Sequence, residues 1–287
     1  MREITLHLPK TDYSPGEHVE GHAVILCDED FDCESVNLVF SCMEQSRVVV
    51  GSGKHRRVYL EQHDYFEQFL ELLSQSRVLE GETRFEFAFK IPEESVSSFE
   101  GTFSWIRYMI KGKIEVKWAL DPKAEQNIVV VAPPQQHLVM EEAMIQKEIG
   151  KEGIHLLRVE VESDIIRRGN DFRFRFLVGS EANFRGVRVE LVRRENVAPQ
   201  GRETSYDNEM DLQYWEEYRL HRESWVDVTV KTDKEWPEAF KSELIECVYM
   251  LKVTLDIRWR LDKSIEVPLK LSTDSREDEF GTSIFDF

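Results

Sequence analysis

The feature that most constrains the fold is a fourteen-residue stretch that the chain contains twice. It runs from Tyr108 to Asp121 and again from Tyr249 to Asp262, which lies 141 residues later and aligns without a gap. The identical residues Tyr108, Met109, Lys111, Trp118, Leu120 and Asp121 recur as Tyr249, Met250, Lys252, Trp259, Leu261 and Asp262. Two unrelated strands seldom agree at so many ungapped positions, so this pattern indicates an internal duplication.

Both copies alternate between apolar and charged residues. In the first copy, Ile110 and Ile114 share one parity, while Lys111, Lys113 and Glu115 share the other. A period of two with one apolar face is typical of a strand that covers a core on one side only. Strands of a buried parallel sheet would read as continuous apolar runs instead. We therefore expect two similar antiparallel β domains in tandem.

The length and composition agree with this division. The chain has 287 residues, of which 41% are hydrophobic, enough for two separate cores. Pro133-Pro134 interrupts the strand pattern near the middle. We predict a first β-sandwich over residues 1–133, a linker over 134–152, a second β-sandwich over 153–271 and an acidic tail over 272–287.

The charge excludes some classes of partner. The formal net charge is −18, which argues against nucleic acid as a partner and against adsorption on an anionic membrane through overall charge. No apolar run approaches the ~20 residues of a membrane helix. The chain enters a strand pattern at Ile4 without a signal-peptide pattern. We expect a cytoplasmic protein that meets membranes only peripherally, through its partners.

The cysteines give no sign of metal or redox chemistry. Cys27, Cys33, Cys42 and Cys247 form no C-x-x-C pair. Cys42 and Cys247 lie inside strand patterns and are expected to act as small core residues with reduced thiols. No cofactor is predicted.

Two segments have helical spacing. Phe66, Phe69, Leu70 and Leu73 follow the i, i+3, i+4, i+7 pattern of one apolar helical face, which predicts a short helix packed on the first sandwich. Leu138 to Ile149 has a weaker pattern that ends at Gly150, and it predicts a second short helix in the linker.

Several motifs resemble the arrestin superfamily, most closely its α-arrestin branch. They are Tyr13-Ser14-Pro15-Gly16-Glu17, Val19-Glu20-Gly21, Ile91-Pro92, Ser98-Phe99-Glu100-Gly101, Ile106-Arg107-Tyr108, Trp236-Pro237 and Tyr249-Met250-Leu251-Lys252. The resemblance covers residues 1 to 271, and the Ser-Phe-Glu-Gly string with Ile-Arg-Tyr is its most specific part. It implies an all-β protein of two tandem immunoglobulin-like antiparallel β-sandwiches of arrestin type, with one short helix on the first.

The chain also departs from the family pattern. Members that recruit ubiquitin ligases carry Pro-Pro-x-Tyr, whereas Pro133-Pro134 is followed by Gln135-Gln136. Receptor-desensitising members carry paired lysines on the first strand, whereas Lys10 stands alone. Glu20, which precedes Gly21, is the candidate for the acid of their buried polar core, without an identifiable arginine partner. The phosphate-sensing mechanism of those members is therefore not carried over.

The sharpest local feature is a basic loop formed by Lys54, His55, Arg56 and Arg57. Two apparent strands flank it, and Gly51 and Gly53 precede it, which predicts a hairpin with a basic tip. By resemblance, this region corresponds to the loop with which family members probe receptors. We interpret it as a contact for an acidic or phosphorylated peptide, or for a lipid headgroup. The alternative is a solvated hairpin tip.

Two further candidates are weighed against simpler explanations. Phe280, Phe285 and Phe287 are spaced along the acidic tail and suit a short linear motif that docks on the chain itself or on a trafficking protein, unless the tail is only a loose terminus.

His18, Glu20 and His22 share one strand face and are residue types that bind zinc, but no fourth ligand is visible.

Together these patterns predict a non-enzymatic, arrestin-like adaptor or scaffold that binds protein partners such as cargo, receptors, or trafficking and signalling components. A subunit of a retromer-type sorting complex is the alternative among binding proteins. A metal-dependent binding protein or enzyme on a β-sandwich is the alternative of another class. No pattern addresses the oligomeric state.

Overall fold

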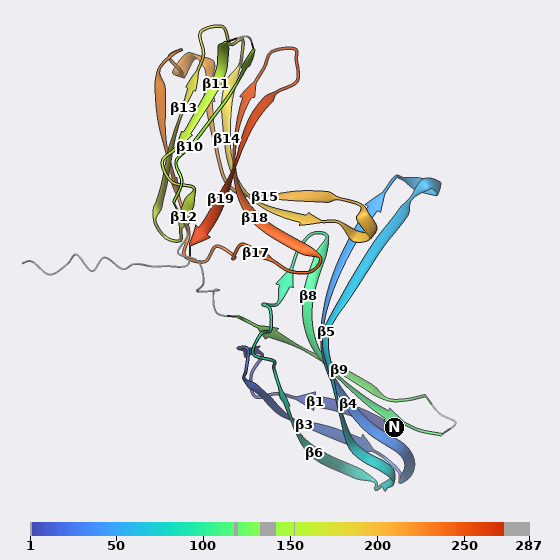
Figure 1. Ribbon diagram of the computed structural model, residues 1–287. Coiled ribbons are helices and arrows are strands. Elements are labelled where there is room, and N and C mark those ends of the chain that lie inside the picture. The colour runs from blue at the N-terminus through green and yellow to red at the C-terminus, as the bar shows by residue number, and fades with distance from the viewer. Residues whose placement is uncertain (1, 118–119, 133–141, 152, 273–287) are drawn as a thin grey trace, which may run out of the picture. The chain divides into compact units, whose positions relative to one another are not determined.

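The computed structural model describes residues 2–117, 120–132, 142–151 and 153–272 (Figure 1). The contacts within the chain divide it into two compact units. The first contains Met1–Pro133 together with two short later segments, Val197–Thr204 and Ser242–Ile245. The second contains the rest of the chain from Pro134 onward. Each unit is built from two β-sheets.

In the first unit, a three-stranded sheet has the order β1-β3-β6, and all its pairs are antiparallel. The other sheet has the order β2-β9-β8-β4-β5, with β7 paired to β8. The strands of this unit are β1 (Arg2–His7), β2 (Asp12–Tyr13), β3 (His18–Cys27), β4 (Phe31–Val50), β5 (Arg57–Val78), β6 (Gly81–Lys90), β7 (Phe99–Glu100), β8 (Ser104–Glu115) and β9 (Lys123–Val130).

The core of the first unit comes from alternate residues of facing strands. Phe40 on β4 and Phe89 on β6 belong to different sheets, and their ring centroids lie 5.5 Å apart. Phe40 is fully buried and also lies 6.4 Å from the ring of Tyr108 on β8. The two sheets therefore pack face to face as a β-sandwich, as the alternation predicts.

The second unit repeats this arrangement. One sheet has the order β10-β11-β13-β16, and the other has the order β12-β19-β18-β14-β15 with β17 paired to β18. Its strands are β10 (Ile145–Lys151), β11 (Ile154–Val161), β12 (Ile165–Arg167), β13 (Asp171–Val178), β14 (Gly186–Val197), β15 (Thr204–Glu216), β16 (Trp225–Lys231), β17 (Phe240–Lys241), β18 (Ile245–Asp256) and β19 (Lys263–Ser272).

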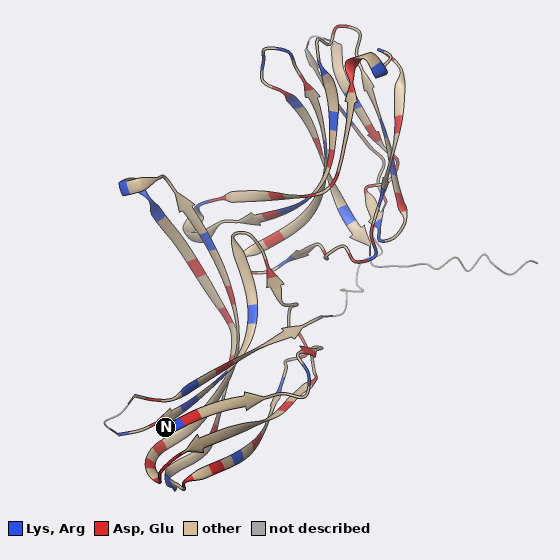
Figure 2. Cartoon of the chain, turned by 180° about the vertical axis from the view of Figure 1, so that it is seen from behind, with Lys and Arg blue, Asp and Glu red and all other residues tan. Residues whose placement is uncertain are grey.

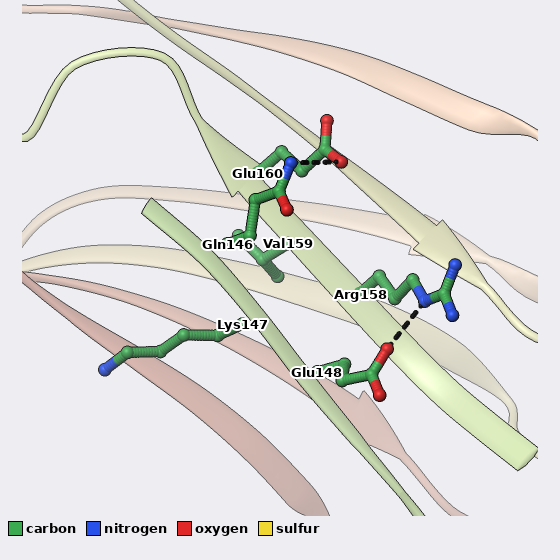
Figure 3. Close-up of a pocket in the computed structure, with 6 residues that line it drawn as sticks. All are labelled: Gln146, Lys147, Glu148, Arg158, Val159 and Glu160. Carbon is green, nitrogen blue, oxygen red and sulfur yellow. Dashed lines mark hydrogen bonds and ion pairs between the residues drawn. The ribbon is translucent and has the colours of Figure 1, made fainter. Parts of the chain in front are cut away.

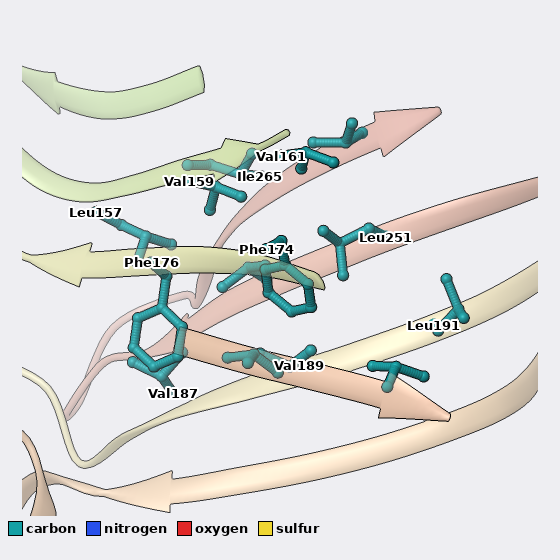
Figure 4. Packing of buried hydrophobic residues seen from close by; sticks show 14 of the residues in the cluster. Leu157, Val159, Val161, Phe174, Phe176, Val187, Val189, Leu191, Leu251 and Ile265 are labelled. Carbon is teal, nitrogen blue, oxygen red and sulfur yellow. The ribbon is translucent and has the colours of Figure 1, made fainter. Parts of the chain in front are cut away.

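Aromatic and aliphatic residues from both of its sheets form one continuous core. Phe174 and Phe176 of β13 lie on one side, and Val187, Val189 and Leu191 of β14 lie on the other (Figure 4). All five are buried. The second unit is therefore also a β-sandwich, and the all-β, arrestin-type fold predicted from the sequence is confirmed.

The strand register confirms that the repeated stretch is structurally equivalent in the two units. Tyr108 pairs with Ile128 across β8 and β9, and Tyr249 pairs with Leu269 across β18 and β19. Ile128 and Leu269 are themselves 141 residues apart. The short strands β7 and β17 join their partners in matching register, through Phe99 with Ile106 and Phe240 with Cys247.

The helix predicted around Phe66 is wrong, because residues 63–73 lie within β5. Two β-bulges in the pairing of β4 with β5, at Cys42/Met43 and Val36/Asn37, shift which residues of β5 face inward. As a result, Phe66, Leu70 and Leu73 are all partly buried, and their i, i+4, i+7 spacing imitates one face of a helix. Phe69, the remaining member of the expected helical face, is 64% exposed.

The second predicted helix, over residues 138–149, is wrong in its described part. Ile145 begins β10, which pairs antiparallel with β11 as an edge strand of the second unit. The apolar residues Ile145 and Ile149 pack against the core from this strand. Residues 138–141 lie outside the described part of the chain.

Candidate functional site

The basic residues singled out in the sequence lie at the tip of the β4–β5 hairpin. The last paired residues are Val50 and Arg57, and a single turn of 3₁₀ helix over Gly53–His55 connects the two strands. The expected hairpin is thus present. Figure 2 shows the blue of Lys and Arg at this tip. The tip stands at the end of the long pairing of β4 with β5, which two β-bulges interrupt farther from the tip.

Glycine is required at the start of this turn. Gly51 has φ +80°, and a Cβ atom there would meet the carbonyl oxygen of His55 at 2.6 Å. The His55 amide donates to the Ser52 carbonyl at 3.1 Å, and the Arg56 amide donates to the Gly53 carbonyl at 3.3 Å. These bonds close a tight turn and leave every side chain from Lys54 to Arg57 exposed.

The charged groups at this tip are not neutralised by neighbours. Among the described residues, Lys54, Arg56 and Arg57 make no ion pair, although the chain carries 55 acidic residues. Directly below the tip, the cross-strand neighbours Val49 and Val58 are 41% and 48% exposed. The tip therefore combines unpaired cations with partly exposed apolar surface, which suits contact with an acidic ligand.

The hairpin is braced close to its tip, at Tyr59, Leu60 and Glu61, within the same unit. Gln200 lies in a short 3₁₀ turn, Pro199–Gly201, which belongs to one of the two later segments grouped with the first unit. Its amide donates to Glu61 Oε2 at 2.7 Å, and its side chain donates to the Leu60 carbonyl at 2.9 Å. Arg202 lies over the ring of Tyr59 at 5.1 Å. Bracing lowers the cost of ordering the hairpin when a ligand binds.

Glu20 is not the acid of a buried polar core, so that prediction is wrong. Its side chain is exposed, because it lies on the outward parity of β3 next to the fully buried Val19. The motif around Gly21 identified the strand but not the side of the strand that faces the core.

The buried carboxylate of this unit is Glu44 instead, with no exposed surface. It accepts hydrogen bonds from the Tyr65 hydroxyl at 2.7 Å, the Ser242 hydroxyl at 2.6 Å and the Leu244 amide at 3.0 Å. Burial and the bond to Glu44 raise the pKa of Tyr65. The sequence contained a signal for this group, because Glu44 continues the inward parity of Leu38, Phe40 and Cys42 along β4.

The second sandwich contains a three-residue ionic cluster that the sequence did not reveal. Arg194 donates two hydrogen bonds to Asp207, at 2.6 and 2.9 Å, and two to Glu266, at 2.8 and 3.0 Å. These bonds raise the pKa of Arg194 and lower those of Asp207 and Glu266. Arg194 on β14 thus links Asp207 on β15 to Glu266 on β19. Because the charged groups of the cluster bind one another, we interpret it as structural.

The residues proposed for metal binding have other neighbours. His18 and Glu20 are exposed, whereas His22 is partly buried, stacks on His7 at 4.9 Å and accepts a hydrogen bond from Arg84 at Nδ1. Partial burial and the Arg84 guanidinium lower the pKa of His22. In the part of the chain that the structure describes, no group of three or more His, Cys, Asp or Glu side chains is placed to hold a metal ion.

A shallow hollow of about 410 Å³ lies over β10 and β11 (Figure 3). Its polar groups are largely paired with one another. Gln146 donates to Glu160 at 3.0 Å, and Arg158 donates to Glu148 at 2.8 Å. A ligand would have to displace these bonds, so the hollow is a weaker candidate than the hairpin tip.

The remaining candidates have mixed outcomes. All four cysteines are free and buried, which confirms the prediction that Cys42 and Cys247 are core residues. Burial raises the pKa of Cys42 to about 12 and that of Cys247 to about 11. Phe280, Phe285 and Phe287 of the tail lie outside the described residues, as do Pro133 and Pro134. No helix in the described ranges is long and apolar enough to cross a membrane.

The fold defines an arrestin-type protein of two β-sandwich units, and comparison with known proteins supports this class. Residues 2–137 match the family model described as arrestin (or S-antigen), N-terminal domain. This part of the chain is therefore similar to the N-terminal domain of arrestins. Over 134 residues it is 26% identical to Arrestin domain-containing protein 1 of Rattus norvegicus. That alignment covers 46% of this chain and only 30% of the relative, whose name agrees with the α-arrestin branch.

Proposed function

We propose that this chain is a non-enzymatic, arrestin-like adaptor that binds protein partners, and that the tip of its β4–β5 hairpin contacts an acidic or phosphorylated segment of such a partner. Members of the family act as adaptors, which supports the general role. The specific role of the tip rests on one observation. Lys54, Arg56 and Arg57 are exposed and have no acidic partner among the described residues of a strongly acidic chain.

The physical argument is electrostatic. In a chain with a net charge of −18, most of the surface repels an acidic peptide, and a local group of unpaired cations attracts it. Two arginines at the tip can bind carboxylate or phosphate groups through paired N–H donors. The exposed pair Val49 and Val58 adds apolar contact area beside these charges. The tip therefore favours acidic segments that carry a nearby apolar residue.

Cross-linking mass spectrometry of the whole chain in its native cell would identify the partners. The test variant carries Lys54→Glu, Arg56→Glu and Arg57→Glu. A matched control carries Lys111→Glu, Lys231→Glu and Lys234→Glu, which change the net charge equally at other exposed positions. We expect the test variant to lose at least one acidic partner that the control retains. If the test variant retains every partner, the basic tip is not the contact.

A further inference from the structure

Strand β15 leaves one edge of its sheet open. It is the last strand in the order β12-β19-β18-β14-β15, and among the described strands it pairs with β14 alone (Figure 1). In an antiparallel pair, alternate residues direct their N–H and C=O groups away from the partner strand. Between Asp207 and Glu216, no hydrogen bond from the described residues reaches these outward groups. β15 therefore presents a row of main-chain donors and acceptors that are available to a further strand.

Other edge strands of this protein are capped by glutamine side chains. On β5, the Leu60 carbonyl accepts a hydrogen bond from the Gln200 side chain at 2.9 Å. On β16, the Thr229 carbonyl accepts one from the Gln213 side chain at 3.2 Å. Caps of this kind occupy groups that would otherwise pair with another chain. The described part of the chain places no such cap on β15 between Asp207 and Glu216.

The side chains along this edge alternate between acidic and apolar. Glu209 and Asp211 share one parity, and Leu212 and Tyr214 share the other. Successive side chains of a strand point to opposite faces, so the two acids lie on one face and the two larger groups on the other. Leu212 is 47% exposed and Tyr214 is 45% exposed, although both side chains are largely apolar. An added strand would cover them through cross-strand side-chain pairs.

The edge also carries uncompensated negative charge. No lysine or arginine occurs from Glu203 to Tyr218. Asp207 is held by Arg194. Glu209 and Glu216, in contrast, are exposed and make no ion pair within the described ranges. A local surplus of one charge selects a ligand of the opposite charge, which here is a basic one.

We propose that the open edge of β15 over Asp207–Glu216 binds an extended segment of a partner protein in which basic residues alternate with apolar ones. The segment joins the sheet as an additional strand through main-chain hydrogen bonds. Its apolar side chains cover Leu212 and Tyr214, and its basic side chains lie beside Glu209 and Asp211. The proposal adds a second contact to the proposed adaptor function, but it uses other residues and the opposite charge, so either contact can fail without the other.

Charge also distinguishes this partner from the chain itself. A second copy that paired through its own β15 would bring the acids of both strands close together, and like charges opposite each other destabilise a strand pair. The tail over residues 272–287 is also acidic, so it suits this edge no better. A partner segment rich in Lys or Arg has the complementary charge, and strand pairing gives it a specificity that charge alone does not.

The test measures the binding of labelled peptides to the full chain at physiological ionic strength. The peptides have about ten residues, enough to span the edge, and Lys alternates in them with Val, Leu or Tyr. A control peptide carries proline in place of one central apolar residue, which keeps the charge but removes a main-chain donor. By fluorescence anisotropy, we expect at least one alternating peptide to bind saturably and its proline control to bind about tenfold more weakly.

A substitution on the edge locates the contact. Leu212→Lys removes an apolar contact and places a cation where the basic peptide binds. Val129→Lys is the matched control, because Val129 is 45% exposed and lies on β9, which has a strand on each side. We expect Leu212→Lys to weaken peptide binding about tenfold or more and Val129→Lys to have little effect.

A charge variant tests the same contact without changing an apolar residue. Glu209→Lys with Asp211→Asn should weaken peptide binding about tenfold. Glu125→Lys with Asp64→Asn, which is an equal change of charge at exposed positions of the first unit, should not weaken it. Charge reversal at the basic hairpin tip should also leave the binding of these peptides unchanged, which separates this contact from that of the proposed function.

Amide hydrogen exchange identifies the strand that the peptide joins. Residues 207–216 should exchange more slowly in the complex, because their outward amides are then hydrogen-bonded. The proposal is overturned if none of the alternating peptides binds, if the proline control binds as well, or if both edge variants bind as the wild type does. It is also overturned if the slower exchange appears only on another strand, or if it arises from dimerisation of the chain without peptide.

Discussion

Tyr108 and Tyr249 make the same hydrogen bond in the two units. Tyr108 donates its hydroxyl to the Val96 carbonyl at 2.6 Å, and Tyr249 donates to the Pro237 carbonyl at 2.8 Å. Both acceptors lie twelve residues before their donors, and both rings are buried. The duplication therefore extends beyond strand register to the bond that anchors the segment leading into the central strand of each sandwich.

This equivalence predicts that removing either hydroxyl lowers the free energy of unfolding by a similar amount. Tyr108→Phe and Tyr249→Phe each leave a carbonyl without its partner, which costs about 1–3 kcal/mol for a buried group. We expect each substitution to lower the free energy of unfolding by that amount in urea titrations. Tyr218→Phe, at a residue that is 73% exposed, is the control and should change stability by less than about 0.5 kcal/mol. An unchanged midpoint for either buried tyrosine would contradict the equivalence.

The strand structure of residues 63–73 makes a prediction that the helical alternative does not make. Phe66 lies 5.1 Å from the ring of Phe40 and 6.0 Å from that of Tyr108, whereas Phe69 is 64% exposed. Phe66→Ala should cost about 2 kcal/mol, less than for a fully buried phenylalanine because Phe66 is only half buried. Phe69→Ala should cost less than about 0.5 kcal/mol. If residues 63–73 formed an amphipathic helix, Phe66→Ala and Phe69→Ala would lower the free energy of unfolding by similar amounts. Urea unfolding of the two variants distinguishes the strand from the helix.

The buried carboxylate of Glu44 should be sensitive to truncation. Glu44→Ala leaves the Tyr65 hydroxyl, the Ser242 hydroxyl and the Leu244 amide without their acceptor. We expect a loss of about 3 kcal/mol or more in the free energy of unfolding, because several buried donors lose their partner together. Glu20→Ala is the matched control at an exposed glutamate and should have little effect. Equal effects of the two substitutions would show that Glu44 is not the buried acid of this unit.

The Arg194 cluster predicts a dependence of stability on pH. The hydrogen bonds from Arg194 hold the pKa of Asp207 below its ordinary value, so the charged form is favoured in the folded state. The stabilisation is fully present above the pKa of the unfolded state, about 3.9, and is lost as the pH falls through the lower folded pKa. Asp207→Asn should therefore destabilise the chain at pH 7, and the difference from wild type should shrink below about pH 4.

Urea unfolding of both proteins between neutral and acid pH measures this difference. Asp233→Asn, at an exposed aspartate outside the cluster, is the control and should show a much smaller pH-dependent difference. A destabilisation by Asp207→Asn that stays constant as the pH falls would indicate that packing, and not the charge of Asp207, stabilises this region.

The sequence by itself determined the strand-based architecture. The alternation around Tyr108 and Tyr249 and their recurrence half a chain apart were enough to predict two sandwiches, because a period of two can bury only one face of an extended strand. The hairpin and its exposed basic tip followed from glycines and charges within a few residues of Lys54. These features depend on local geometry, which a sequence pattern records directly.

Only the tertiary structure decided which side chains face the core where the pattern is irregular. Each bulge leaves one extra residue in β5 and is visible only in the register with β4, so the residues around Phe66 alone imitate a helix. Two of the three hydrogen-bond donors that satisfy the buried Glu44 lie more than 190 residues away in the sequence, so no local pattern could reveal them. Trp259 is exposed because it lies in the turn between β18 and β19, outside the paired part of the sheet. Its hydrophobicity alone would have suggested burial.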